Sequence, residues 1–114
     1  MVVVAVRDLV FRSKIHAAAG QAGVEVRLAP RGTPLAEAVR DAPGATLLVD
    51  LAEAGVVEQI AEAKRVAGVR VVGFLGHLEA ERMAEARAAG ADEVLTRGQF
   101  VARLPELLGR GAGG

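Results

Sequence analysis

The chain has 114 residues, enough for one domain with its own core, and its 52% hydrophobic content is typical of a folded globule. Its 14 basic and 14 acidic residues balance, and its only aromatic residues are three phenylalanines, so no charged footprint or stacking platform for nucleic acid is expected. The absence of cysteine excludes disulfides, thiol chemistry and cysteine-based metal sites.

Five apolar runs have the length and composition of β-strands. The first, VVVAV, is continuous and mostly β-branched, which is typical of a strand buried on both faces. The second, VEVRL, contains alternating polar residues and predicts a strand at a sheet edge or one that is half covered. The predicted strands are residues 2–6, 24–28, 45–49, 69–75 and 93–96.

Segments with helical patterns alternate with these strands. Gly20, Gly68 and Gly90 each follow such a segment, and glycine is a common helix stop. After a PRGTP loop, Thr33 is expected to cap a short helix with Pro34 at its first position. The other predicted helices are residues 10–19, 52–67, 78–89 and 99–108. Residues 1–109 then form the domain, and the Gly-rich residues 110–114 form a flexible tail.

The alternation of strand and helix predicts parallel strands joined by right-handed crossovers. No repeat or linker divides the chain, so we expect a single three-layer α/β domain. In such sheets, ligands and chemistry gather at the carboxyl ends of the strands. Four groups of residues follow predicted strands and are therefore candidates: 7–8, 50, 76–77 and 96–97.

Asp8 and Asp50 are expected at the ends of neighbouring strands. Two carboxylates close together repel each other unless a cation lies between them. The cation could be Mg²⁺, which prefers oxygen ligands, or the guanidinium of Arg7 or Arg97. An aspartate can also accept a phosphoryl group where a metal and a basic side chain neutralise the incoming phosphate. The residues alone leave these alternatives open.

Three stretches, in this order, resemble the receiver domains of the response-regulator family, which have the CheY-like fold. They are VVAVRDLVFRSKI, TLLVDLAEAG and VVGFLGHLEAERMAEARAAGADEVLTRGQF. The resemblance extends to about Leu108 and rests on the order of the motifs. It implies a flavodoxin-like, doubly wound sheet of five parallel strands in the order 2-1-3-4-5, with five helices in three layers.

The resemblance implies roles for five positions, but the match is partial. Asp50 stands at the phosphoacceptor position, and Asp8 at one of two acidic, metal-binding positions, the other of which is Arg7. Leu75 replaces the usual Ser or Thr, and Arg97 the usual Lys. We expect Arg7 to fill the place of the metal and to pair with Asp8 or Asp50. This implies a pseudo-receiver without a cofactor, in which Asp8 is a metal ligand only if Mg²⁺ does bind.

The resemblance further implies a stand-alone module of two-component signalling or a phosphorelay, with no enzymatic activity, that docks onto a protein partner. The expected docking face consists of the helix 78–89, the strand 93–96 and the helix 99–108, and a homodimer could use the same face. Neither nucleic acid nor a membrane is expected as a partner. The polar residues expected on this face are Arg82, Glu85, Arg87, Arg97, Gln99 and Arg103.

Two alternative functions stay open. One is an active phosphoacceptor that uses Asp50, with Asp8 as the one acidic ligand and Arg97 in place of Lys. The other is a small ligand-binding protein on a flavodoxin-like fold, because the fold alone does not determine function. Mg²⁺ binding by the chain would favour the first of these.

Two features bear on where the protein works. The apolar start, MVVVAV, is too short for a signal peptide, and no apolar run approaches the length of a membrane span, so we expect a cytoplasmic protein. Arginine supplies 12 of the 14 basic residues and asparagine is absent, which suits a thermophile and equally a coding bias toward Arg and Ala.

Overall fold

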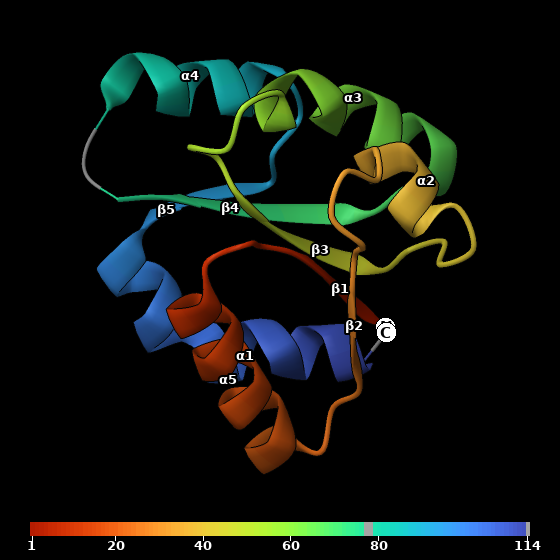
Figure 1. The fold of residues 1–114 in the computed structure, drawn as a ribbon, viewed down its shortest axis with the longest axis vertical. Coiled ribbons are helices and arrows are strands. Elements are labelled where there is room, and N and C mark those ends of the chain that lie inside the picture. Colours follow the sequence, from red (N-terminus) through yellow and green to blue (C-terminus); the bar gives the residue numbers. More distant parts are fainter. Residues whose placement is uncertain (77–78, 114) are drawn as a thin grey trace.

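The structure, a computed structural model, describes residues 1–76 and 79–113, with the backbone alone for 110–113. Five parallel strands form one sheet in the order β2-β1-β3-β4-β5, which confirms the predicted flavodoxin-like fold. Figure 1 shows α2, α3 and α4 on one face of the sheet and α1 and α5 on the other. The strands are β1 (Val2–Ala5), β2 (Val26–Leu28), β3 (Thr46–Asp50), β4 (Arg70–Leu75) and β5 (Glu93–Thr96). The helices are α1 (Leu9–Ala22), α2 (Leu35–Val39), α3 (Val56–Ala67), α4 (Ala80–Ala88) and α5 (Arg97–Gly113).

β3 is the central strand and is buried along its whole length. Residues 46–49 pair with residues 2–5 of β1, and residues 46–50 pair with residues 70–74 of β4. Because these strands are parallel and in register, their carboxyl ends meet at one edge of the sheet. β2 is an edge strand and is half-buried, as its alternating sequence predicts.

Two apolar layers hold the helices against the sheet. Leu47 and Leu75 point into the layer below α2, α3 and α4, and Leu48 and Phe74 point into the layer above α1 and α5. Each of these four side chains is fully buried. Burial of one such side chain contributes about 1.5–3 kcal/mol, so the two layers dominate the stability of the fold.

The ends of α1 and α3 test the predicted glycine stops. α1 does not stop at Gly20 but continues to Gly23, which has φ 68° and donates its N–H to the carbonyl oxygens of Ala19 and Gly20. A glycine inside a helix costs only about 1 kcal/mol relative to alanine, and the rest of α1 offsets this. The predicted stop at Gly68 is confirmed, with φ 58° and its N–H donated to the oxygen of Lys64.

Other boundaries differ from the sequence-based expectations. Thr33 does not cap α2: the N-cap is Pro34, and the N–H of Leu35 is donated instead to Oε1 of Gln59 at 2.8 Å. α5 extends to Gly113, beyond its predicted end, because glycine weakens a helix without blocking it sterically. The flexibility of residues 110–114 stays a prediction. The predicted start of the fourth helix at residue 78, and the candidate His77, lie outside the described residues.

No helix within the described ranges is both long and apolar enough to cross a membrane.

One contact leaves no room for a side chain at the centre of the sheet. A Cβ added at Gly73 of β4 would lie 2.6–2.8 Å from three carbon atoms of the Leu51 side chain, which is fully buried. We predict that Gly73→Ala lowers the free energy of unfolding by about 1–3 kcal/mol, measured by chemical denaturation, because the core becomes overpacked.

Gly20→Ala is the matched control. No atom lies within 4 Å of a Cβ built at Gly20, so this variant is expected to be about 0.5–1 kcal/mol more stable than the wild type. Adding Leu51→Val to Gly73→Ala should recover part of the loss. A Gly73→Ala protein as stable as the wild type would contradict the packing account.

Candidate functional site

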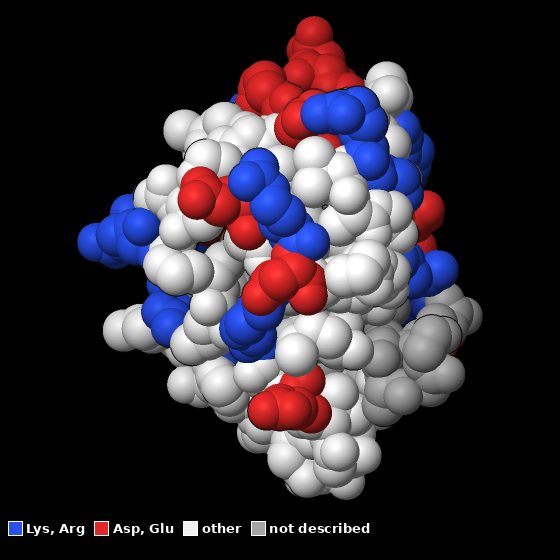
Figure 2. Space-filling view, turned by 90° about the vertical axis from the view of Figure 1, so that its right-hand side faces the viewer, with Lys and Arg blue, Asp and Glu red and all other residues white. Residues whose placement is uncertain are grey.

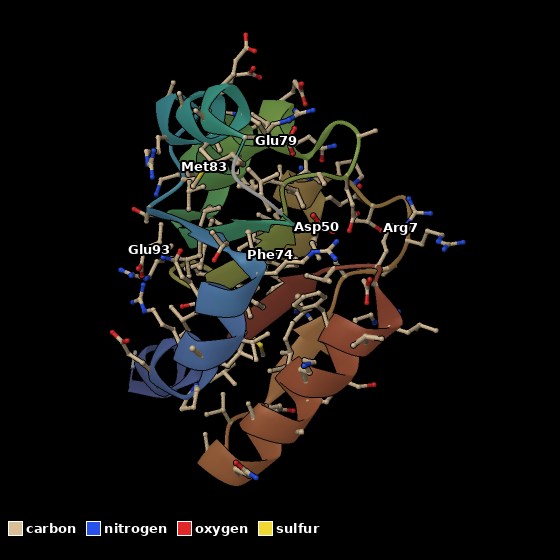
Figure 3. All side chains as sticks on the ribbon, turned by 90° about the vertical axis from the view of Figure 1, so that its left-hand side faces the viewer. Arg7, Asp50, Phe74, Glu79, Met83 and Glu93 are labelled. Atoms are coloured by element: carbon tan, nitrogen blue, oxygen red, sulfur yellow. The ribbon has the colours of Figure 1, made fainter. Side chains whose placement is uncertain are left out.

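Asp50 is the last residue of β3 and lies where the carboxyl ends of β1, β3 and β4 meet (Figure 3). Its side chain is only 7% exposed. Oδ1 of Asp50 accepts the N–H of Ala52 at 2.9 Å, so the carboxylate closes the turn that follows the strand. Within the described part of the chain, Asp50 forms no ion pair. A buried carboxylate is thus present at the predicted position, with one oxygen bound to the backbone.

Asp8 is the N-cap of α1. Its Oδ1 accepts the N–H groups of Val10 at 2.9 Å and Phe11 at 3.1 Å, two of the donors that the first turn of a helix leaves without partners. Its negative charge also lies at the positive end of the helix dipole. This local role accounts for an aspartate at this position without a metal.

Arg7 does not pair with Asp8 or Asp50 in the part of the chain that the structure describes, so the predicted ion pair is wrong. Arg7 is exposed, and its backbone N–H is donated to Oε2 of Glu53 at 3.1 Å. Its side chain lines a cleft formed by the loops after β1, β2 and β3, which we call the arginine cleft. Figure 3 shows Asp50 near the centre of the carboxyl edge and Arg7 to its right.

Glu53 is a second carboxylate near Asp50 that the sequence analysis missed. Burial raises the pKa of Glu53 and the charge of Asp50 raises it further, while the backbone N–H and the guanidinium of Arg7 act in the opposite direction. The helix predicted from residue 52 would have placed Glu53 in an exposed first turn. Because α3 begins only at Val56, Glu53 belongs to a loop that turns back toward β1.

Leu75 and Arg97 flank this edge in different ways. Leu75 is fully buried in the apolar layer on the α3 side, so it offers neither a polar atom nor an exposed surface. The guanidinium carbon of Arg97 lies 5.2 Å from the centre of the Phe11 ring, and a Cβ built on Gly76 would lie 3.3 Å from Nε of Arg97. Arg97 therefore extends from the start of α5 past the end of β4 to α1, where a cation–π contact contributes about 0.5–1 kcal/mol.

The side chains at this edge offer few of the ligands that a divalent metal prefers. Mg²⁺ binds through carboxylate oxygens in a near-octahedral arrangement. Among residues 1–76 and 79–109, no group of three or more His, Asp or Glu side chains is placed to hold a metal ion. Oδ1 of Asp8 and Oδ1 of Asp50 already accept backbone N–H groups.

The start of α5 is held by a reciprocal pair of hydrogen bonds. Oγ1 of Thr96 accepts the N–H of Gln99 at 3.2 Å, and Oε1 of Gln99 accepts the N–H of Thr96 at 3.0 Å. This is a capping box, which occupies two backbone donors at a helix N-terminus. The side-chain oxygen of Gln99, predicted to contact a partner, is therefore used within the molecule.

A network of ion pairs joins β4, β5 and α5. Glu93, labelled in Figure 3, accepts hydrogen bonds from Arg103 and Arg70, and Arg103 also donates to Glu106 through Nε at 3.1 Å. The bond from Arg103, more than the bond from Arg70, lowers the pKa of Glu93 against the opposing effect of burial. The guanidinium of Arg103 is therefore used in contacts within the domain. Of the predicted contact residues on α4, Glu85 and Arg87 are exposed and Arg82 is half-buried.

The face of the molecule in Figure 2 carries basic and acidic side chains next to one another, with no broad area of one sign. Ion pairs of opposite charge account for several of the surface charges, among them Arg27–Asp41, Lys64–Asp92 and Arg65–Glu62. This face therefore lacks the positive stripe that nucleic-acid binding requires.

The fold is that of the receiver domains of response regulators. A response regulator from Thermotoga maritima superimposes with a TM-score of 0.78, at 14% identity, over 99% of this chain and 97% of its own. A response regulator receiver domain from Rhodospirillum rubrum gives 0.76 at 16% identity, over 99% and 94%. The beryllofluoride-activated NtrC4 receiver domain dimer gives 0.74 at 16% identity, over 96% and 97%. The sequence matches no model of a protein family and no curated protein.

The capping role of Asp8 can be measured directly. We predict that Asp8→Ala lowers the free energy of unfolding by about 1 kcal/mol, because two N–H groups of α1 lose their acceptor. Asp8→Asn should change stability little, because asparagine caps helices as well as aspartate does. If Asp8→Ala were as stable as the wild type in chemical denaturation, the N-cap would not explain this aspartate.

Proposed function

We propose that the chain is a receiver-like signalling module that acts by docking onto a protein partner, and not by Mg²⁺-dependent phosphorylation of Asp50. One observation carries the proposal. Asp50 ends β3, where the resemblance to receivers places the phosphoacceptor, but its Oδ1 is hydrogen-bonded within the turn that follows the strand. The structural relatives are described as response regulators and receiver domains, which supports a signalling role for the same fold here.

The first argument concerns the residues that usually bind the metal in receivers. A receiver that binds Mg²⁺ usually carries two acidic residues after its first strand, and this chain has Arg7 and Asp8 there. Oδ1 of Asp8 is committed to the N-cap of α1, and Arg7 adds a permanent positive charge to the same loop. With one acidic residue and a nearby cation, the loop is a poor site for a divalent metal.

The groups that would hold a phosphoryl group give the second argument. Leu75 has no hydroxyl and is fully buried, so it cannot follow a phosphoryl group by hydrogen bonding. Arg97 has the charge of the usual lysine, but its guanidinium lies over the Phe11 ring. A buried Asp50 without these partners is suited to closing its turn, and we propose that this is its present role.

The experiment is an NMR titration of the backbone amides with Mg²⁺, followed by Mg²⁺ with beryllofluoride, which mimics a phosphoryl group on aspartate. We expect no saturable shifts at Asp8, at Asp50 or at the ends of β4 and β5, because the metal lacks a second acidic ligand. Saturable shifts in the wild type that disappear in Asp50→Asn would show a working phosphoacceptor and would refute this part of the proposal.

The docking face is proposed on α4, β5 and α5. Glu85, Arg87 and Arg97 are exposed there, while Gln99 and Arg103 are held in place by the capping box and the ion-pair network. The apolar side chains that are exposed on α4 are all small, such as those of Ala84 and Ala88. A polar face with little apolar area is typical of weak, transient contacts, which suits a signalling partner.

We propose that a second copy of the chain is one partner of this face, in keeping with the structural relative described as a dimer. Arg87→Glu should lower the fraction of dimer in sedimentation experiments. In a symmetric contact, the new glutamate of one copy would face Glu85 of the other, and the two negative charges would repel each other. The double variant Glu85→Arg/Arg87→Glu should restore the dimer by exchanging the two signs.

Arg40→Glu, a charge reversal at an exposed residue that ends α2, is the control and should leave the dimer unchanged. A chain that stays monomeric at every concentration, or a dimer that ignores both α4 substitutions, would remove the homodimer from the proposal and leave other proteins as the partners.

A further inference from the structure

The arginine cleft is the feature that neither the receiver fold nor the docking face explains. It has a volume of about 370 Å³, within the range of roughly 300–1,000 Å³ that is usual for small-molecule sites. It is formed by the loops after β1, β2 and β3, at the carboxyl edge of the sheet, where α/β folds bind their ligands. Asp50 does not line it, so the cleft is separate from the phosphoacceptor position.

The charged residues that line the cleft are mostly of one sign. Arg7, Arg12 and Arg31 are the basic residues among those that line it, and Glu53 is the acidic residue. The chain as a whole has no net charge, so this concentration of positive charge is local. Guanidinium groups bind phosphate and carboxylate through paired hydrogen bonds, which makes such a cleft suited to an anion.

These three arginines have no side-chain acceptor within the described part of the chain, whereas four arginines elsewhere bind carboxylates. Arg27 binds Asp41, and Arg65 binds Glu62. In the cleft, Oε2 of Glu53 accepts the backbone N–H of Arg7. Arg12 is half-buried and lines the cleft, and among the described residues no side chain accepts a hydrogen bond from it.

The loop after β2 holds one of these arginines in a tight turn. The N–H of Thr33 is donated to the oxygen of Pro30 at 3.1 Å, and Gly32 takes φ 82° in the turn between them. Arg31 is the second residue of this turn, and a proline lies on each side of the turn's centre, at positions 30 and 34. A loop fixed in this way loses less entropy when a ligand binds.

The rest of the lining offers an apolar wall and one further donor. Leu28, Ala29 and Val56 lie along the cleft. Oε1 of Gln59 accepts the N–H of Leu35, which leaves the amide nitrogen of Gln59 free to donate. A site with convergent cations, one amide donor and apolar walls suits a molecule with an anionic group on an organic body.

We propose that the arginine cleft binds a small organic phosphate, of the size of a nucleoside monophosphate, with its phosphate on Arg7, Arg12 and Arg31 and its organic part against the apolar wall. The site is independent of phosphorylation at Asp50 and of docking through α4, β5 and α5. Binding would place a dianion beside the loop that follows β3, and so couple the level of a small molecule to the carboxyl edge of the sheet.

The test is a titration of the 15N-labelled protein with AMP, GMP, CMP, UMP, glucose 6-phosphate, adenosine and inorganic phosphate, with dissociation constants from calorimetry. We expect saturable shifts at the amides of Arg7, Arg12, Glu53 and residues 31–33 with at least one organic phosphate, and weaker binding of inorganic phosphate and adenosine. The proposal is overturned if none of the organic phosphates produces such shifts, or if adenosine binds as tightly as the organic phosphate that binds best. It is equally overturned if inorganic phosphate binds as tightly as every organic phosphate, because the apolar wall would then contribute nothing.

Matched variants distinguish binding in the cleft from non-specific attraction of anions to basic residues. Arg12→Gln and Arg31→Gln should each weaken binding about tenfold, the usual effect of losing a charge-assisted hydrogen bond. Glu53→Gln should tighten binding by removing the one negative charge in the cleft. Arg40→Gln removes an exposed arginine outside the cleft and should have no effect. Equal weakening by Arg40→Gln and Arg12→Gln, in proteins with unchanged thermal unfolding, would refute the site.

Discussion

The carboxyl edge of this molecule depends on the packing of Leu51 against Gly73. Leu51 follows β3 directly, donates its N–H to the oxygen of Phe74 at 3.0 Å and occupies the space that a side chain at position 73 would need. Because of this contact, the chain stays buried for one residue after β3, at Leu51, before it turns. Asp50 is held at the rim as a result, and the loop after it turns back far enough for Glu53 to reach Arg7. The candidate site is therefore built by an apolar contact.

The fold could be predicted because its strands are buried and carry continuous apolar runs, which locate β1, β3 and β4 without any alignment. The ends of the helices were harder to predict. Two glycines, Gly20 and Gly23, could each end α1, and the one that does so takes a left-handed conformation. Nothing local distinguishes them. With the stop at Gly23, the N–H of Val24 is donated to the oxygen of Ala19 at 2.9 Å and Val24 packs against the apolar layer, a contact that is set by the tertiary structure.

The positions of candidate residues could be predicted where strand ends determine them, but not where a loop does. Asp8 and Asp50 lie at the predicted edge, because parallel strands in register end together. The ion pair of Arg7 was predicted wrongly because a long side chain on a loop can lie on either side of its strand. Glu53 was missed because residues 52–55 were assigned to a helix that begins only at Val56. The capping box was readable from Thr96 and Gln99, since T-x-x-Q before an apolar run is its usual signature.

The join between β5 and α5 has a mechanical consequence. β5 ends at Thr96 and α5 begins at Arg97, with no loop residue between them, and the capping box and the bond from Arg103 to Glu93 tie the two elements together. A strand and a helix joined in this way should move together. A force applied at this side of the molecule would tilt both elements at once, since the start of the helix cannot loosen without breaking both ties. The exposed face of the helix would then change its angle and keep its shape.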